Sequence, residues 1–180
     1  MFDNEERNYI ASLVKKIMEN SAEEKYMDKP GDYPEKMDEV MGFCIRFKKD
    51  GEIAFTISNP YPHTSLIDAM INTISGFEGL KEVQEKLDEM TMEINIIEEP
   101  ELIDIRSLQD YMKNIEIGKH GILLEYGPYS SLILPQIAQE NKWSVEEMLK
   151  QICMQANLPE NAWKNPEVNI YRFESETFSG

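Results

Sequence analysis

The sequence contains little of what many functional sites are built from. It has two cysteines, Cys44 and Cys153, and neither has a second Cys or a His at metal-ligand spacing, so no disulfide framework or zinc site is indicated. Arginine is scarce, with 4 residues against 14 lysines, which leaves little of the bidentate anion recognition that guanidinium groups provide. We expect two free thiols, no metal and no cofactor.

Long apolar runs and positive charge are also missing. The longest aliphatic stretches, at 122–124 and 132–134, fall far short of the roughly 18 residues that a membrane span needs. The acidic start, at 3–6, is unlike the basic and then apolar start of a signal peptide. With 34 acidic and 18 basic residues, the net charge of −16 repels phosphate backbones. We therefore expect a cytoplasmic protein with neither a membrane nor a nucleic acid as partner.

The familiar catalytic motifs are absent as well. The chain has no P-loop, no Rossmann glycine fingerprint, no G-x-S-x-G and no H-E-x-x-H. Several large classes of enzyme therefore lose their sequence support. We assign no catalytic residue, and the absence of these motifs favours a protein that is not an enzyme.

Apolar residues make up 41% of the chain, which is enough for one domain over residues 1–180. Their spacing predicts an amphipathic helix over 4–20, and two alternating runs joined by Asp50-Gly51 predict a hairpin over 43–57. Helices are expected at 66–74, 80–87, 107–113, 136–141 and 144–156, and strands at 92–96, 122–126, 131–134 and 168–178. Hairpins with helices between them predict an α+β fold with a mainly antiparallel sheet and flanking helices.

One segment resembles a known family. Residues 132–143, Leu-Ile-Leu-Pro-Gln-Ile-Ala-Gln-Glu-Asn-Lys-Trp, are similar to the L-L-L-P-Q-V-A-x-E-x-x-W signature of the AMMECR domain, named for the AMME-syndrome candidate region. The Gly-Lys-His-Gly turn at 118–121 and the segments 153–159, 162–163 and 168–178 resemble the same family in order. The best match therefore spans 118–178, and the register extends back to about residue 40.

The resemblance implies an α+β fold of two intertwined subdomains in a family that occurs in archaea, bacteria and eukaryotes. It also implies an association with radical-SAM proteins and with a metal-dioxygenase-like domain called Memo, which makes such proteins candidate partners. It implies no settled activity, because a fold hosts many functions.

The departures from the family pattern bear on function. The family hallmark L-R-G-C-I-G aligns with Ile-Ala-Phe-Thr-Ile-Ser at 53–58, so that its Arg, its Cys and both glycines are replaced. A second family stretch, D-P-R-F-P-P-L, is lost at 76–81. We therefore expect the surface that would meet a ligand to have lost its reactive groups.

Six polar residues remain as candidate ligand-binding residues: Thr56, His63, Lys119, His120, Gln136 and Glu140. Thr56 stands where the family has its cysteine, and His63 lies at a strand-to-helix junction. His120 and Lys119 occupy a turn that resembles the family's own, and the titration of His120 near neutral pH suits acid–base work. Gln136 and Glu140 share a helical face. Structural roles are open for all six, as exposed loop residues, strand packing or loop anchors.

Three functions compete. The first is a non-catalytic binding or adaptor domain in a modification pathway. It is supported by the presence of the family signature at 132–143 together with the replacement of the hallmark residues at 53–58. The second is an enzyme or small-molecule-binding protein, with a pocket between the 43–57 hairpin, the 118–121 turn and the helix start at Gln136. The third is a homo-oligomeric structural protein that pairs through an exposed hairpin edge. We favour the first.

Overall fold

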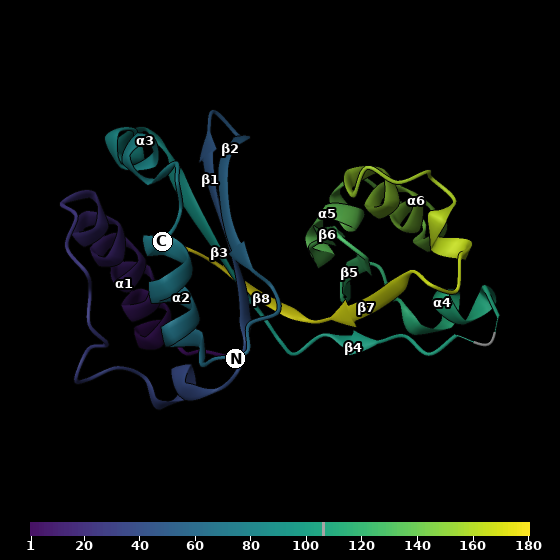
Figure 1. Cartoon of the computed structure of the whole chain (residues 1–180), viewed down its shortest axis with the longest axis horizontal. Helices are drawn as coiled ribbons and strands as arrows, with labels where there is room; N and C mark the ends of the chain where they lie inside the picture. Colours follow the sequence, from purple (N-terminus) through teal and green to yellow (C-terminus); the bar gives the residue numbers. More distant parts are fainter. Residues whose placement is uncertain (106) are drawn as a thin grey trace. The chain divides into compact units, whose positions relative to one another are not determined.

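The computed structural model describes residues 1–105 and 107–180, and its contacts divide the chain into two compact units (Figure 1). Unit 1 contains Met1–Ile97 and Glu176–Gly180, and unit 2 contains Glu98–Ser175. Each unit has a four-stranded sheet of its own with helices packed on it, which confirms the α+β fold.

The sheet of unit 1 has the order β2-β1-β3-β8, with strands β1 (Gly42–Lys49), β2 (Glu52–Asn59), β3 (Thr91–Ile97) and β8 (Ser175–Ser179). The predicted hairpin is confirmed as β1 and β2. Asp50 and Gly51 have φ angles of 53° and 85°, the left-handed geometry that a two-residue hairpin turn requires.

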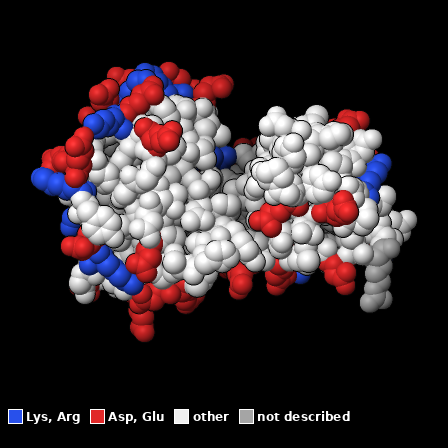
Figure 2. Space-filling view, viewed as in Figure 1, with Lys and Arg blue, Asp and Glu red and all other residues white. Residues whose placement is uncertain are grey.

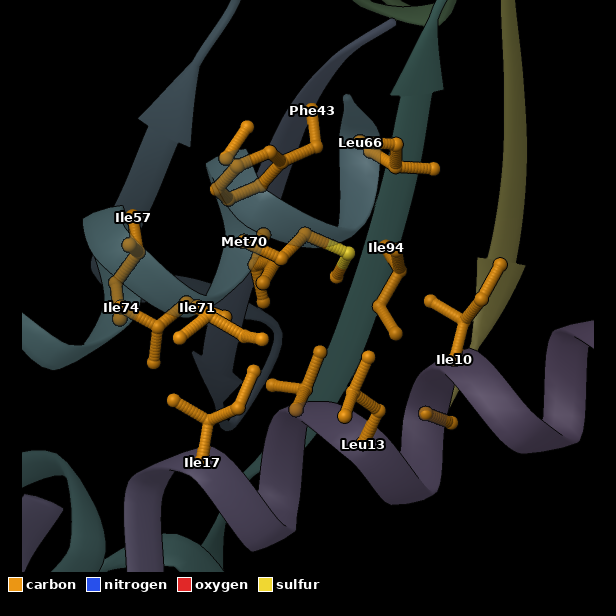
Figure 3. Close-up of a cluster of buried hydrophobic side chains, with 14 of the residues drawn as sticks. Ile10, Leu13, Ile17, Phe43, Ile57, Leu66, Met70, Ile71, Ile74 and Ile94 are labelled. Atoms are coloured by element: carbon orange, nitrogen blue, oxygen red, sulfur yellow. The ribbon is translucent and has the colours of Figure 1, made fainter. Parts of the chain in front are cut away.

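The helices of unit 1 are α1 (Asn4–Ala22), α2 (Leu66–Ser75) and α3 (Leu80–Glu85), with short 3₁₀ turns η1 (Glu35–Asp38) and η2 (Leu87–Glu89). The Asp3 carboxylate accepts from the Glu5 and Glu6 amides and so caps α1. Figure 3 shows side chains of α1 and α2 meeting those of the sheet, among them Ile17, Met70 and Ile94, all fully buried.

The sheet of unit 2 has the order β4-β7-β5-β6. Its strands are β4 (Glu101–Leu102), β5 (Gly121–Tyr126), β6 (Tyr129–Ile133) and β7 (Asn169–Phe173), and its helices are α4 (Gln109–Asn114), α5 (Pro135–Glu140), α6 (Val145–Gln155) and the 3₁₀ turn η3 (Ala162–Lys164). The core under α6 includes Leu149, Ile152 and Trp163. This unit contains the segment that resembles the family signature.

The single closing strand predicted for 168–178 is wrong in one respect. The segment forms two strands, β7 and β8, which belong to different sheets and are separated at Glu174. The β-branched and aromatic residues of this segment predicted extended backbone, but such a composition carries no information about which sheet a strand joins. The two-residue strand β4 was missed because it is too short to show alternation.

The surface charge is mixed rather than segregated over unit 1. Figure 2 shows Lys and Arg side chains interspersed with Asp and Glu over α1 and α3. Exposed pairs such as Lys86–Glu82 and Lys81–Glu24 belong to this surface. In the part of the chain that the structure describes, no helix is both long and apolar enough to cross a membrane.

Candidate functional site

Unit 2 contains a charged cavity of about 270 Å³ that includes two of the predicted residues. Lys119, His120 and Arg172 supply its hydrogen-bond donors, and Phe173 also lines it. Its carboxylates come from Glu98, Glu99, Glu101 and Glu174. The cavity therefore presents both signs of charge to a ligand.

The turn before β5 places Lys119 and His120 in this cavity. Their backbone amides both donate to the Glu116 carbonyl, at 3.2 and 2.9 Å. Gly118 has a φ of +86°, a backbone conformation that side-chain-bearing residues rarely adopt, so the turn favours glycine. The family-like turn is thus held by backbone hydrogen bonds.

Arg172 reaches the same cavity from β7, where it lies opposite Ile122 in the β5–β7 register. Its Nε and Nη2 atoms donate to Glu101 Oε2 at 3.2 and 2.9 Å, and Nη1 donates to the Asn114 carbonyl at 3.1 Å. These bonds tie β4 and the end of α4 to β7. Sequence reasoning missed Arg172, although the scarcity of arginine was a usable signal.

His120 is held as a neutral donor. It is buried, and its Nδ1 accepts a hydrogen bond of 3.0 Å from the Glu116 backbone amide. An Nδ1 that accepts from an N–H has no proton of its own, so the neutral ring has its proton on Nε2. Burial lowers the pKa of His120, and the positive charges of Arg172 and Lys119 lower it further. The carboxylates of Glu174 and Glu116 raise the pKa by less, so that it is lowered overall.

This bonding argues against the acid–base role considered for His120. To act as a general base, the neutral ring would need an unprotonated Nε2 facing the cavity, and its proton would then be on Nδ1. The Glu116 amide N–H already points at Nδ1, so the hydrogen bond would be lost. The nearest carboxylate oxygen, Glu174 Oε1, lies 3.9 Å from Nε2, which is too far for a hydrogen bond. Nε2–H is therefore a donor that faces the cavity with no acceptor among residues 1–105 and 107–180.

The tautomer is directly measurable. We expect long-range ¹H–¹⁵N NMR spectra at pH 7 to show His120 as the Nε2–H tautomer, with a titration midpoint below the ordinary histidine value of 6.5. The variant His63→Gln assigns the remaining signal to His120. A protonated Nδ1 in the neutral ring contradicts the assignment.

The other four predicted residues lie outside this cavity. Gln136 is half-buried and Glu140 is exposed on α5. Thr56 and His63 belong to unit 1, where both are exposed and His63 packs edge-on against Tyr61 with ring centroids 5.9 Å apart. The pocket predicted between the hairpin, the 118–121 turn and the helix start at Gln136 combines residues of both units and stays a prediction.

The stretch aligned with the family hallmark lies in β2, and its neighbour β1 bears a guanidinium and a thiol. Arg46 lies directly opposite Thr56, and Cys44 opposite Ser58. Directly opposed residues share a face of the sheet, and this face is the one away from Phe43, Ile45 and Phe47. The groups missing from β2 therefore occur one strand away.

Neither group is available for chemistry. Arg46 is buried and paired with Glu93, which also binds Lys48 at 2.6 Å. Burial raises the pKa of the Cys44 thiol to about 11, so it is protonated at neutral pH. Burial likewise raises the pKa of Cys153 in unit 2. The described residues contain no group of three His, Cys, Asp or Glu side chains that could hold a metal ion.

Comparisons with known proteins agree with the resemblance. The sequence model of the AMMECR1 family matches residues 11–178. The chain is 37% identical over 153 residues to the protein MJ0810 of Methanocaldococcus jannaschii, covering 81% of this chain and 76% of that one. A protein of Nanoarchaeum equitans is 30% identical over 175 residues, with 94% and 97% covered. The crystal structure of the uncharacterised protein PH0010 from Pyrococcus horikoshii superposes with a TM-score of 0.83 at 27% identity, covering 99% of this chain and 93% of that one.

Proposed function

The chain belongs to the AMMECR1 family, and from this premise we propose that it acts as a non-catalytic binding domain whose ligand enters the cavity of Lys119, His120 and Arg172. The observation that carries the proposal is the hydrogen bond from the Glu116 amide to His120 Nδ1. It fixes the imidazole of the cavity as a donor, which can recognise a ligand but cannot act as a general base.

The state of the remaining reactive groups supports the same proposal. The stretch aligned with the family hallmark exposes Thr56 in place of a thiol, and the Cys44 thiol on the next strand is buried and protonated. Nucleophilic catalysis needs an activated nucleophile beside a base. Lys119 and His120 of the cavity lie in the turn that resembles the family's own, and Arg172, Phe173 and Glu174 lie in the closing segment that also resembles it.

A thermal-shift screen of the full chain against a panel of small charged metabolites tests the proposal. A ligand that binds the cavity at 100 times its Kd stabilises the fold by about 2.7 kcal/mol, which raises Tm by roughly 5–10 °C for a chain of this size. We expect Lys119→Gln to reduce that shift, since it removes the cavity's half-exposed ammonium group.

The matched control is Lys15→Gln, which removes one exposed charge from α1. It is expected to keep the full thermal shift. The proposal fails if no metabolite shifts the wild-type Tm, or if every shift persists unchanged in Lys119→Gln. Turnover of a bound metabolite, followed by NMR, contradicts the non-catalytic part alone.

A further inference from the structure

The charges of the cavity are unequal in number. Glu174 pairs with Lys119 at 3.2 Å, and Glu101 pairs with Arg172. Glu98 and Glu99 form no ion pair with any residue that the structure describes, and both are exposed at the cavity. Since His120 is neutral, the cavity has two more carboxylates than cations. This surplus attracts positive charge and repels a simple anion.

The donors of the cavity nevertheless favour a carboxylate. Lys119 Nζ and His120 Nε2 lie 3.2 and 3.9 Å from the same oxygen, Oε1 of Glu174. Of these two donors, the Glu174 oxygen thus binds Lys119 alone, and the nearby Nε2–H of His120 is left to donate to a ligand oxygen. An ammonium group has three donors, and the single ion pair of Lys119 leaves the others for a second carboxylate.

Arg172 adds to the donor side. Its bonds to Glu101 and Asn114 use three of its five N–H groups, and the guanidinium is fixed by them. A prearranged guanidinium costs a ligand little ordering entropy. These donors are therefore suited to a carboxylate, while Glu98 and Glu99 supply negative charge with no counterion.

We infer that the cavity binds a small molecule that carries an ammonium group and a carboxylate together, with a dibasic amino acid as the preferred class. The inference rests on the proposed function and names its ligand. The carboxylate would lie against Lys119, His120 Nε2–H and Arg172, and the side-chain ammonium group would meet Glu98 and Glu99. The volume of about 270 Å³ is slightly below the usual range of ligand pockets, which suits a single amino acid better than a nucleotide.

Isothermal titration calorimetry with five probes tests the inference on the full chain at low salt. The probes are L-lysine, L-alanine, L-glutamate, putrescine and acetate. We expect L-lysine to bind most tightly, because only this probe has both a carboxylate and a surplus positive charge. L-glutamate and acetate should bind at least about tenfold more weakly, since they add negative charge to a cavity that already has an excess.

Two double variants locate the binding. Glu98→Gln/Glu99→Gln removes the two carboxylates that have no ion pair and should weaken L-lysine binding by about five- to tenfold while leaving L-alanine nearly unchanged. The matched control, Glu78→Gln/Glu85→Gln, removes two exposed charges from unit 1 and should change neither affinity by more than about twofold. Circular dichroism verifies that all variants fold.

Each outcome separates the inference from the proposed function. Putrescine that binds as tightly as L-lysine overturns the carboxylate half of the inference, and L-glutamate that binds as tightly overturns the charge argument. If other metabolites shift the wild-type Tm and Lys119→Gln reduces those shifts, but no amino acid binds, the ligand class is wrong while the proposed function stands. If no probe and no metabolite binds, both fall.

Discussion

Replacing Glu93 by leucine is expected to lower the free energy of unfolding by about 3 kcal/mol, because it leaves a buried guanidinium without its counterion. Arg46 is only 5% exposed and donates to Glu93 through both Nε and Nη2. Asn95, fully buried on the same strand as Glu93, donates to the same carboxylate at 3.4 Å. Equilibrium urea unfolding, followed by circular dichroism at pH 7, measures the loss.

Two further variants separate the buried charge from a general loss of contacts. Glu89→Leu breaks an ion pair on the surface, in which Glu89 is 61% and Lys49 is 47% exposed. It should lower the free energy of unfolding by less than about 1 kcal/mol. Arg46→Leu/Glu93→Leu removes both members of the buried pair and should recover most of the stability. If the double variant is as unstable as Glu93→Leu, an unpaired Arg46 is not the cause.

The pH dependence of this pair has a definite sign. Burial by itself raises the pKa of Glu93, but the hydrogen bonds from Lys48 and Arg46 outweigh it and the pKa is lowered overall. The stabilisation is therefore complete above the unfolded-state value near 4.5 and is lost as the pH falls through the lower folded-state value. Unfolding curves between pH 7 and pH 3 should show the difference between wild type and Glu93→Leu shrinking in acid.

The parts of the fold that local chemistry fixes were predictable. Asp50-Gly51 predicted the hairpin because few other pairs adopt two left-handed residues, and both do so here. The helix starts predicted near 66 and 144 are fixed in the same local way, since the Ser65 and Ser144 hydroxyls accept from the amides of Asp68 and Glu147, three residues on. These signals act within four residues, where sequence distance and spatial distance agree.

The parts set by long-range pairing were not predictable. The division of 168–178 between two sheets depends on which strands lie beside β7 and β8, and Ile122 pairs with Arg172 across 50 residues. The turn at 118–121 drew attention to Lys119 and His120 through its family resemblance, yet nothing near it indicated Arg172 or Glu98. The hydrogen bond that fixes the His120 tautomer comes from a backbone amide, which no side-chain pattern reveals.

Gly121 packs closely against Phe173, a residue that lines the cavity. The sequence pattern marked Gly121 only as the end of a turn. Gly121 begins β5, and a Cβ built there would lie 2.3 Å from Phe173 Cζ and 2.8 Å from the Ile133 carbonyl oxygen. Phe173 is buried and lines the cavity. Because real Cβ atoms do not approach so closely, either the ring or the strand must move. Stability and ligand binding are therefore coupled at this position.

We expect Gly121→Ala to lower the free energy of unfolding by about 2–3 kcal/mol through this overpacking. It should also abolish the thermal shift of any ligand that contacts Phe173 in the cavity. The matched control is Gly31→Ala, where a Cβ meets nothing within 4 Å, and it should change stability by less than about 1 kcal/mol. Gly121→Ala/Phe173→Leu should regain part of the loss, since the shorter side chain leaves room for the methyl group while the Ile133 carbonyl still crowds it. Equal stability of the two alanine variants in urea would show that β5 and Phe173 are not packed as closely as the structure places them.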